Sequence, residues 1–281
     1  MNANDINSLF ELKKDEVELL FTKAISNLQK AIEQKVLGFP LIEGGEIPTT
    51  QANLDYLQEV YSSLLSELDN SGYFGAVNSA LEAESDVIKN LKRIYSGTDF
   101  PIEFNAINQQ SFNILQNQKI DYLTNLSTNA ITSIKQSVTD AVIGAVDVSE
   151  ITANIRKELD EKLQRYASTY LETARGQLIQ DAQDWSAQSM RDAGVSIYWE
   201  YIGPEDNKTR EECLFALEKQ VFTDEEKAEF QSGGLFPHDE PRWNCRHTFV
   251  MISQKEYNAR AGESEERSQA FSDRETKRLN S

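Results

Sequence analysis

The chain of 281 residues is 39% hydrophobic, which is enough to bury a core in one large or two ordinary domains. Its 46 acidic and 28 basic side chains leave a formal net charge of -18, which argues against the clustered cations that a nucleic-acid footprint needs. No apolar run approaches the ~20 residues that cross a bilayer, and the N-terminal stretch lacks the features of a secretory signal. We therefore expect a protein that is intracellular at synthesis and whose acidic charge serves either solubility or contact with a basic protein surface, rather than binding to DNA or membrane.

Most of residues 1–195 show apolar side chains at intervals of three and four, the spacing of helices that bury one face. The first helix is expected from Ile6 to a stop at Gly38 and Pro40. The second begins at Thr49 or Thr50, and a third covers residues 76–96. One or two further helices are expected between residues 105 and 146.

The longest helix is expected to begin at Asp147, which stands three residues before Glu150 in a capping-box-like start. It runs toward Gly194, with Gly176 as a candidate kink or break. A helix of this length is typical of a bundle or an assembly, since helices are stabilised mainly by burying an apolar face.

At Val195 the pattern changes to short β-rich runs. Strands are expected in "VSIYWEYIG", "KQVF" and "CRHTFVMIS", and short helices in "TREECLFALE" and "TDEEKAEF". Thr209 and Glu212 have the spacing of a capping box at the first of these helices. The predicted fold class is therefore mainly α: a helical region over 1–195, a small C-terminal α+β domain over 196–253, and a charged tail over 254–281 that is a solvated helix or disordered.

Cys213, His238, Cys245 and His247 are all the cysteines and histidines of the chain, and they fall within 35 positions. These residue types are those of a Cys2His2 zinc site, although the spacing differs from that of a standard zinc finger. Two alternatives stay open: buried cysteines with histidines hydrogen-bonded to loop backbone, or a Cys213–Cys245 disulfide. A thiolate nucleophile, or a histidine general base beside Asp239 or Glu240, would make the cluster catalytic. However, no nucleophile elbow, phosphate-binding glycine loop or HExxH motif accompanies it, so no enzyme is expected.

The C-terminal unit resembles the phage Mu F-like minor head proteins, also called phage head morphogenesis proteins. The resemblance covers residues 165–253. It rests on Trp199, Gly203, Pro204, Asp206, Thr209, Arg210, Cys213, Leu217, Val221, Phe222, Gly233, Gly234, Pro237, Pro241, Asn244, Cys245, Arg246 and His247. The chain departs from the family where many members have paired cysteines: only Cys213 of the first pair is present, and His247 replaces the last cysteine.

The resemblance implies a low-copy structural virion protein, associated with the portal or the capsid interior, that acts in head assembly, DNA packaging or ejection. Its partners would be the portal and/or major capsid protein, with oligomerisation in the virion, and it would be found in the host cytoplasm during assembly. No catalysis comes with the domain. The alternative from another class is a metal- or cysteine-dependent enzyme centred on Cys213, His238, Cys245 and His247, and a third is a helical adaptor of bacterial origin.

Overall fold

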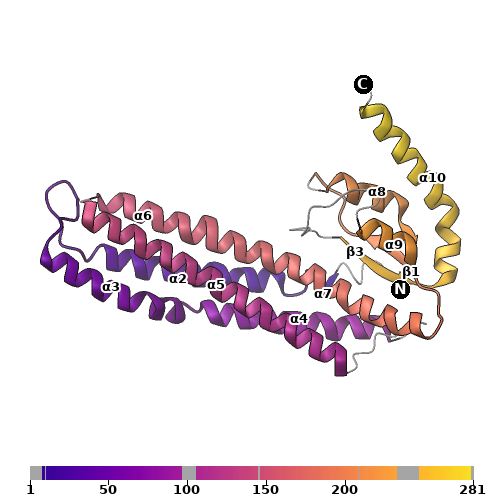
Figure 1. Ribbon diagram of the computed structural model, residues 1–281, viewed down its shortest axis with the longest axis horizontal. Coiled ribbons are helices and arrows are strands. Elements are labelled where there is room, and N and C mark those ends of the chain that lie inside the picture. The colour runs from indigo at the N-terminus through magenta and orange to yellow at the C-terminus, as the bar shows by residue number, and fades with distance from the viewer. Residues whose placement is uncertain are drawn as a thin grey trace. The chain divides into compact units, whose positions relative to one another are not determined.

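The structure is a computed structural model that describes residues 8, 9, 11–96, 106–144, 146–207, 209–232 and 247–279. It is mainly α-helical, with a small antiparallel sheet and helices near the C-terminus (Figure 1). This confirms the fold class predicted from the sequence. By internal contacts the chain divides into unit 1, residues 1–12, 84–111 and 170–281, and unit 2, residues 13–83 and 112–169. The predicted domain limits at 195/196 and 253/254 stay a prediction.

The helices before the sheet follow the predicted order. They are α2 (Lys14–Val36), α3 (Gln51–Asn70), α4 (Tyr73–Tyr95), α5 (Ala106–Gly144), α6 (Val148–Arg156), the π-helix η1 (Lys157–Gln164) and α7 (Arg165–Asp192). The stretch between residues 105 and 146 forms one helix, α5, rather than two. Two predicted starts are confirmed, because Thr50 caps α3 by accepting from the Asn53 amide, and Asp147 caps α6 by accepting from the Ser149 amide at 2.6 Å.

Two details of the helix predictions were wrong. The first helix does not run unbroken from Ile6, because Lys13 adopts a left-handed conformation with φ of 55° and α2 begins only at Lys14. Gly176 does not break the longest helix, since α7 continues through it. The irregularity lies earlier, in the eight-residue π-helix η1, whose Leu159 and Leu163 are buried in unit 2. Apolar spacing does not distinguish a π-helical turn from an α-helical one at this length.

The core of unit 2 consists of the apolar faces of its helices. Phe21 of α2 packs edge-to-face on Tyr73 of α4, with ring centroids 5.6 Å apart. The buried Tyr73 hydroxyl donates to the Leu123 carbonyl of α5 at 3.0 Å, so its burial leaves no polar atom unpaired.

Unit 1 contains the sheet. Its strands are β1 (Tyr198–Ile202), β2 (Val221–Thr223) and β3 (Thr248–Ile252), in the order β2-β1-β3 and antiparallel throughout. The helices α8 (Glu211–Lys219), α9 (Asp224–Gln231) and α10 (Gln254–Leu279) alternate with these strands (Figure 1). The C-terminal segment, for which the sequence left helix or disorder open, is therefore helical.

The two faces of the sheet are covered by different helices. Trp199, Phe222 and Phe249 share one face, where Phe230 of α9 packs 6.0 Å from the Phe222 ring and 5.8 Å from the Phe249 ring. Residue alternation directs the side chain of Tyr198 to the other face, where Tyr257 of α10 stacks on it at 4.5 Å. Arg260 of α10 pairs with Glu200 on this face at 2.7 Å.

Side chains of α7 and α10 form hydrogen bonds with backbone groups on the outer sides of β3 and β2, which face away from β1. On β3, Gln183 of α7 donates to the Phe249 carbonyl at 2.8 Å and accepts from the Met251 amide at 3.1 Å, while Gln180 accepts from the Phe249 amide at 3.1 Å. On β2, the Ser264 hydroxyl of α10 bonds to the Val221 carbonyl at 3.4 Å. Helices thus take the place of neighbouring strands at both edges.

Gln183 gives the first prediction, because its fully buried amide also accepts from the Tyr95 hydroxyl at 2.6 Å. Replacing it by leucine removes its bonds with the Met251 amide and the Phe249 carbonyl, as well as its bond with the Tyr95 hydroxyl, which has a further partner. We expect Gln183→Leu to lower the free energy of unfolding by roughly 2 kcal/mol or more, at about 1–3 kcal/mol for each backbone group that loses its bond. Urea denaturation followed by tryptophan fluorescence measures the change.

The matched control is Gln177→Leu, on the same helix but exposed, where the side chain donates to the Asp181 carboxylate one turn away. We expect that variant to change the free energy of unfolding by less than about 0.5 kcal/mol. Equal losses in the two variants would show that the Gln183 contacts do not hold α7 to β3.

Candidate functional site

The structure describes two of the four predicted metal ligands. Cys213 is buried on α8, and His247 directly precedes β3. His238 and Cys245 lie outside the described residues, as do Asp239 and Glu240. The zinc set therefore stays a prediction.

Cys213 and His247 meet at the same side chain, Tyr201 of β1. The Tyr201 hydroxyl donates to the Cys213 sulfur at 3.4 Å, and the Tyr201 ring lies parallel to the His247 imidazole with centroids 5.7 Å apart and an interplanar angle of 3°. Nε2 of His247 lies 2.8 Å from the Pro204 carbonyl oxygen. A carbonyl oxygen only accepts, so Nε2 is the protonated nitrogen in this arrangement.

The turn after β1 completes this corner of unit 1. The Thr209 hydroxyl donates to the Pro204 carbonyl at 3.1 Å and accepts from the Asp206 amide at 2.9 Å. The prediction that Thr209 caps the following helix was wrong: α8 begins at Glu211, after an N-cap residue Arg210 that makes no side-chain cap bond. Thr209 closes the preceding turn instead, as threonine hydroxyls often do.

The capping box of this region lies at α9. The Thr223 hydroxyl accepts from the Glu226 amide at 3.2 Å, and the Glu226 carboxylate accepts from the Thr223 amide at 2.7 Å. The sequence contains this signal as T-x-x-E, so the residue pattern alone could have located it.

Unit 1 also contains a group of charged side chains, between α7 and α9, that was not predicted from the sequence. Arg191 of α7 pairs with Asp224 of α9, one of its contacts being Nη2 to Oδ1 at 2.7 Å. Asp224 Oδ1 also accepts from the indole nitrogen of Trp199 at 2.8 Å. Lys227 lies one turn further along α9 and pairs with Asp184 of α7. These contacts attach α7 and α9 to the centre of the sheet.

Lys227 is the most deeply buried charge of this group, and its ammonium lies 3.5 Å from the centroid of the Trp199 ring. Burial lowers the pKa of Lys227, although the Asp184 carboxylate acts in the opposite direction. The ammonium form of Lys227 has two favourable partners here, the Asp184 carboxylate and the face of the Trp199 ring. Sequence reasoning missed the group because its members are far apart in the chain and belong to no spaced motif.

The described side chains do not form a metal centre. Among residues 8, 9, 11–96, 106–144, 146–207, 209–232 and 247–279, no three or more His, Cys, Asp and Glu side chains are grouped as a metal site requires. Over these same ranges, no helix combines the length and apolarity needed to cross a bilayer.

Comparison with known proteins gave no match. No protein-family model matches the chain, and neither the curated proteins nor the solved structures include one that does.

The Arg191–Asp224 pair predicts a dependence of stability on pH. Hydrogen bonding from Arg191 lowers the pKa of Asp224. The stability that this carboxylate contributes is therefore present above its unfolded pKa, near 3.9, and is lost as the pH falls through the lower folded value. Because the pair is partly exposed, we expect Asp224→Asn to cost about 1 kcal/mol at neutral pH.

We expect the difference between wild type and Asp224→Asn to shrink below about pH 4, because the carboxylate of the unfolded chain becomes protonated there and that of the folded chain only at lower pH. Denaturation curves at neutral and acid pH provide the measurement, with the exposed Asp273→Asn on α10 as the control. A difference that stays constant across this range would mean that the charge of Asp224 does not stabilise unit 1.

Proposed function

We propose that the chain is a structural phage virion protein of the Mu F-like minor head type, associated with the portal or the capsid interior. Its role would lie in head assembly, DNA packaging or ejection. The observation that carries the proposal is the corner around Tyr201, where Pro204, Thr209, Cys213 and His247 are joined by direct contacts. All four belong to the motif that resembles this family, although they are spread over more than forty positions.

The chemistry of this corner supports a structural role for the motif. The Cys213 thiol is buried and accepts a hydrogen bond, and the His247 Nε2–H is used by a backbone carbonyl. Such bonds fix the turn after β1 against the start of β3. The proposal therefore needs neither a thiolate nucleophile nor a histidine base, and no step in it depends on zinc.

The charge of the chain supports a protein partner. A formal charge of -18 repels the phosphates of DNA, whereas it favours a basic protein surface. We propose that the partner is a portal or major capsid subunit, contacted through the helices of the N-terminal region, and that the chain acts in several copies within the virion.

The proposal predicts that the protein is present in mature particles. We expect mass spectrometry of gradient-purified virions from the source phage to detect it at lower copy number than the major capsid protein. An early nonsense mutation in its gene should block the formation of infectious particles, and a plasmid copy of the gene should restore them.

A paired complementation test connects this role to the fold. A plasmid carrying Gln177→Leu should restore infectivity, whereas Gln183→Leu should restore it less well because unit 1 is destabilised. Purified virions without the protein, or full infectivity of the nonsense mutant in a non-suppressing host, would refute the proposal.

A further inference from the structure

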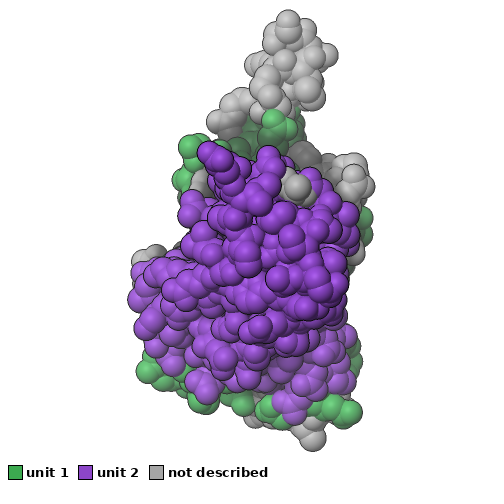
Figure 2. Space-filling model, turned by 90° about the vertical axis from the view of Figure 1, so that its left-hand side faces the viewer, with its two compact units in different colours: residues 1–12, 84–111, 170–281 green, residues 13–83, 112–169 purple. Residues whose placement is uncertain are grey.

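One end of unit 2 exposes large apolar side chains on a folded loop. We define the tip patch as Leu37, Leu41, Ile42 and Ile143, which are 61%, 45%, 48% and 64% exposed. Three of them lie just after α2, in the loop that leads to α3, and Ile143 lies at the end of α5. Figure 2 shows unit 2 (purple) from the end at which this loop lies in Figure 1.

Hydrogen bonds bring these two segments together. The Ile47 amide donates to the Val146 carbonyl at 3.3 Å, and the Val148 amide donates to the Gly45 carbonyl at 3.1 Å. The Thr49 hydroxyl donates to the Val142 carbonyl at 2.7 Å. The loop is therefore attached to the end of α5 and to the α5–α6 connection, so the two segments that carry the tip patch belong to the same end of unit 2.

A glycine and a buried asparagine fix the path of the loop. Gly45 has φ of 86°, and a Cβ there would lie 2.9 Å from the Asp147 carboxylate, so this position requires glycine. The buried Asn53 amide donates to the Pro40 and Pro48 carbonyls at 3.1 and 2.8 Å. A surface that is already ordered loses little conformational entropy when a partner binds.

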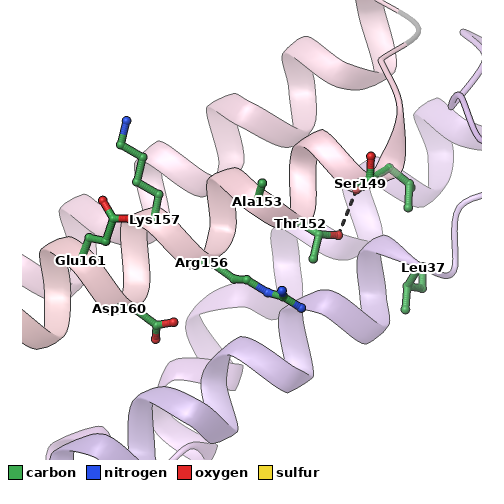
Figure 3. Close-up of a pocket in the computed structure, with 9 residues that line it drawn as sticks. Leu37, Ser149, Thr152, Ala153, Arg156, Lys157, Asp160 and Glu161 are labelled. Carbon is green, nitrogen blue, oxygen red and sulfur yellow. Dashed lines mark hydrogen bonds between the residues drawn. The ribbon is translucent and has the colours of Figure 1, made fainter.

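A surface groove of about 570 Å³ continues from the tip patch along α6 and η1. Figure 3 shows Leu37 at one end of it and Asp160 and Glu161 at the other. Ala153 lies between these ends, and Val148 also lines the groove. Two basic side chains, Arg156 and Lys157, line it beside the two acidic ones, so the charges of the groove itself balance, and Arg156 pairs with Glu33 at 3.0 Å. An elongated groove with an apolar end suits a helix better than a flat surface would.

The charge around the tip patch indicates which charge a partner surface should carry. Residues 37–55 and 140–150 contain no lysine or arginine, and they contain six acidic residues: Glu43, Glu46, Asp55, Asp140, Asp147 and Glu150. Lys35, just before the first segment, pairs with Glu67 at 3.2 Å. Two such surfaces would repel each other, so the charge opposes self-association through the patch.

We propose that the tip patch and its groove bind a basic amphipathic helix of another protein, with the helix's apolar side chains on the patch and its lysines and arginines facing the six acidic residues of residues 37–55 and 140–150. This inference rests on the proposed function only for the identity of the partner as a head subunit. The chemistry of the surface is independent of it.

The experiment uses two fluorescent peptides of about 18 residues, five helical turns, as probes. Both have a leucine face, flanked by lysine in one and by glutamate in the other. Fluorescence anisotropy with the full chain should show binding of the lysine peptide only. Ile42→Ser/Ile143→Ser should weaken that binding roughly tenfold or more, because two apolar contacts are removed.

The matched control is Leu19→Ser/Leu65→Ser, which removes two leucines of unit 2 that are 67% and 53% exposed and lie outside the tip patch. It should leave the affinity within about twofold, since neither side chain contacts the proposed ligand. Glu43→Gln/Glu150→Gln should weaken binding at about 0.1 M salt and have little effect at about 1 M, where the screening length falls from roughly 10 Å to roughly 3 Å.

Equal weakening by the patch and control variants would mean that the peptide binds the acidic chain non-specifically, and the inference would fail. Concentration-dependent self-association that Ile42→Ser/Ile143→Ser abolishes would also overturn it in favour of a second copy as the occupant. Patch-dependent binding by a protein that is absent from virions would leave the surface established and refute only the proposed function.

Discussion

The hydrogen bonds of one buried side chain, Gln183, connect α7 to the sheet of unit 1. Its amide joins α7 to the outer edge of β3 and at the same time receives the Tyr95 hydroxyl of α4, so three elements meet at a fully buried polar group. A short three-stranded sheet buries little surface by itself and is stabilised by packing against helices. The sheet depends on α7 as a substitute strand, and the α7–α9 ion pairs that surround Trp199 act on the same two layers.

The corner around Tyr201 and the group around Lys227 use polar side chains in the same way, although they lie at different places in unit 1. In each, a buried aromatic ring of β1 has a polar partner on a helix: Cys213 of α8 for Tyr201, and Asp224 of α9 for Trp199. Paired polar groups in a core select one packing arrangement, because any shift leaves them unpaired. A structural role of this kind is enough to require particular residue types, such as Cys213 and His247, at positions of the motif, without any catalytic role.

The sequence predicted the helices, the strands and the mainly α fold because apolar periodicity and capping residues are local signals. Thr50 and Asp147 were located from such signals. What failed depended on distant contacts. Thr209 has the spacing of a cap but bonds backward to Pro204, and η1 has the apolar spacing of an ordinary helix. Lys227 and Asp184 lie 43 positions apart, so no local pattern connects them. Cys213 and His247 come together because both contact Tyr201. The pairing of β1 with β3, which places Tyr201 opposite Phe249, brings His247 close to Tyr201.

The covered edges of the sheet have a consequence for the protein at high concentration. Exposed outer strands are the sites at which identical chains add to one another and form extended stacks. In the described sheet, Gln180 and Gln183 bond to the outer side of β3, and Ser264 does so on β2. These bonds oppose strand exchange between copies of the chain at high concentration, because an incoming strand would have to displace them.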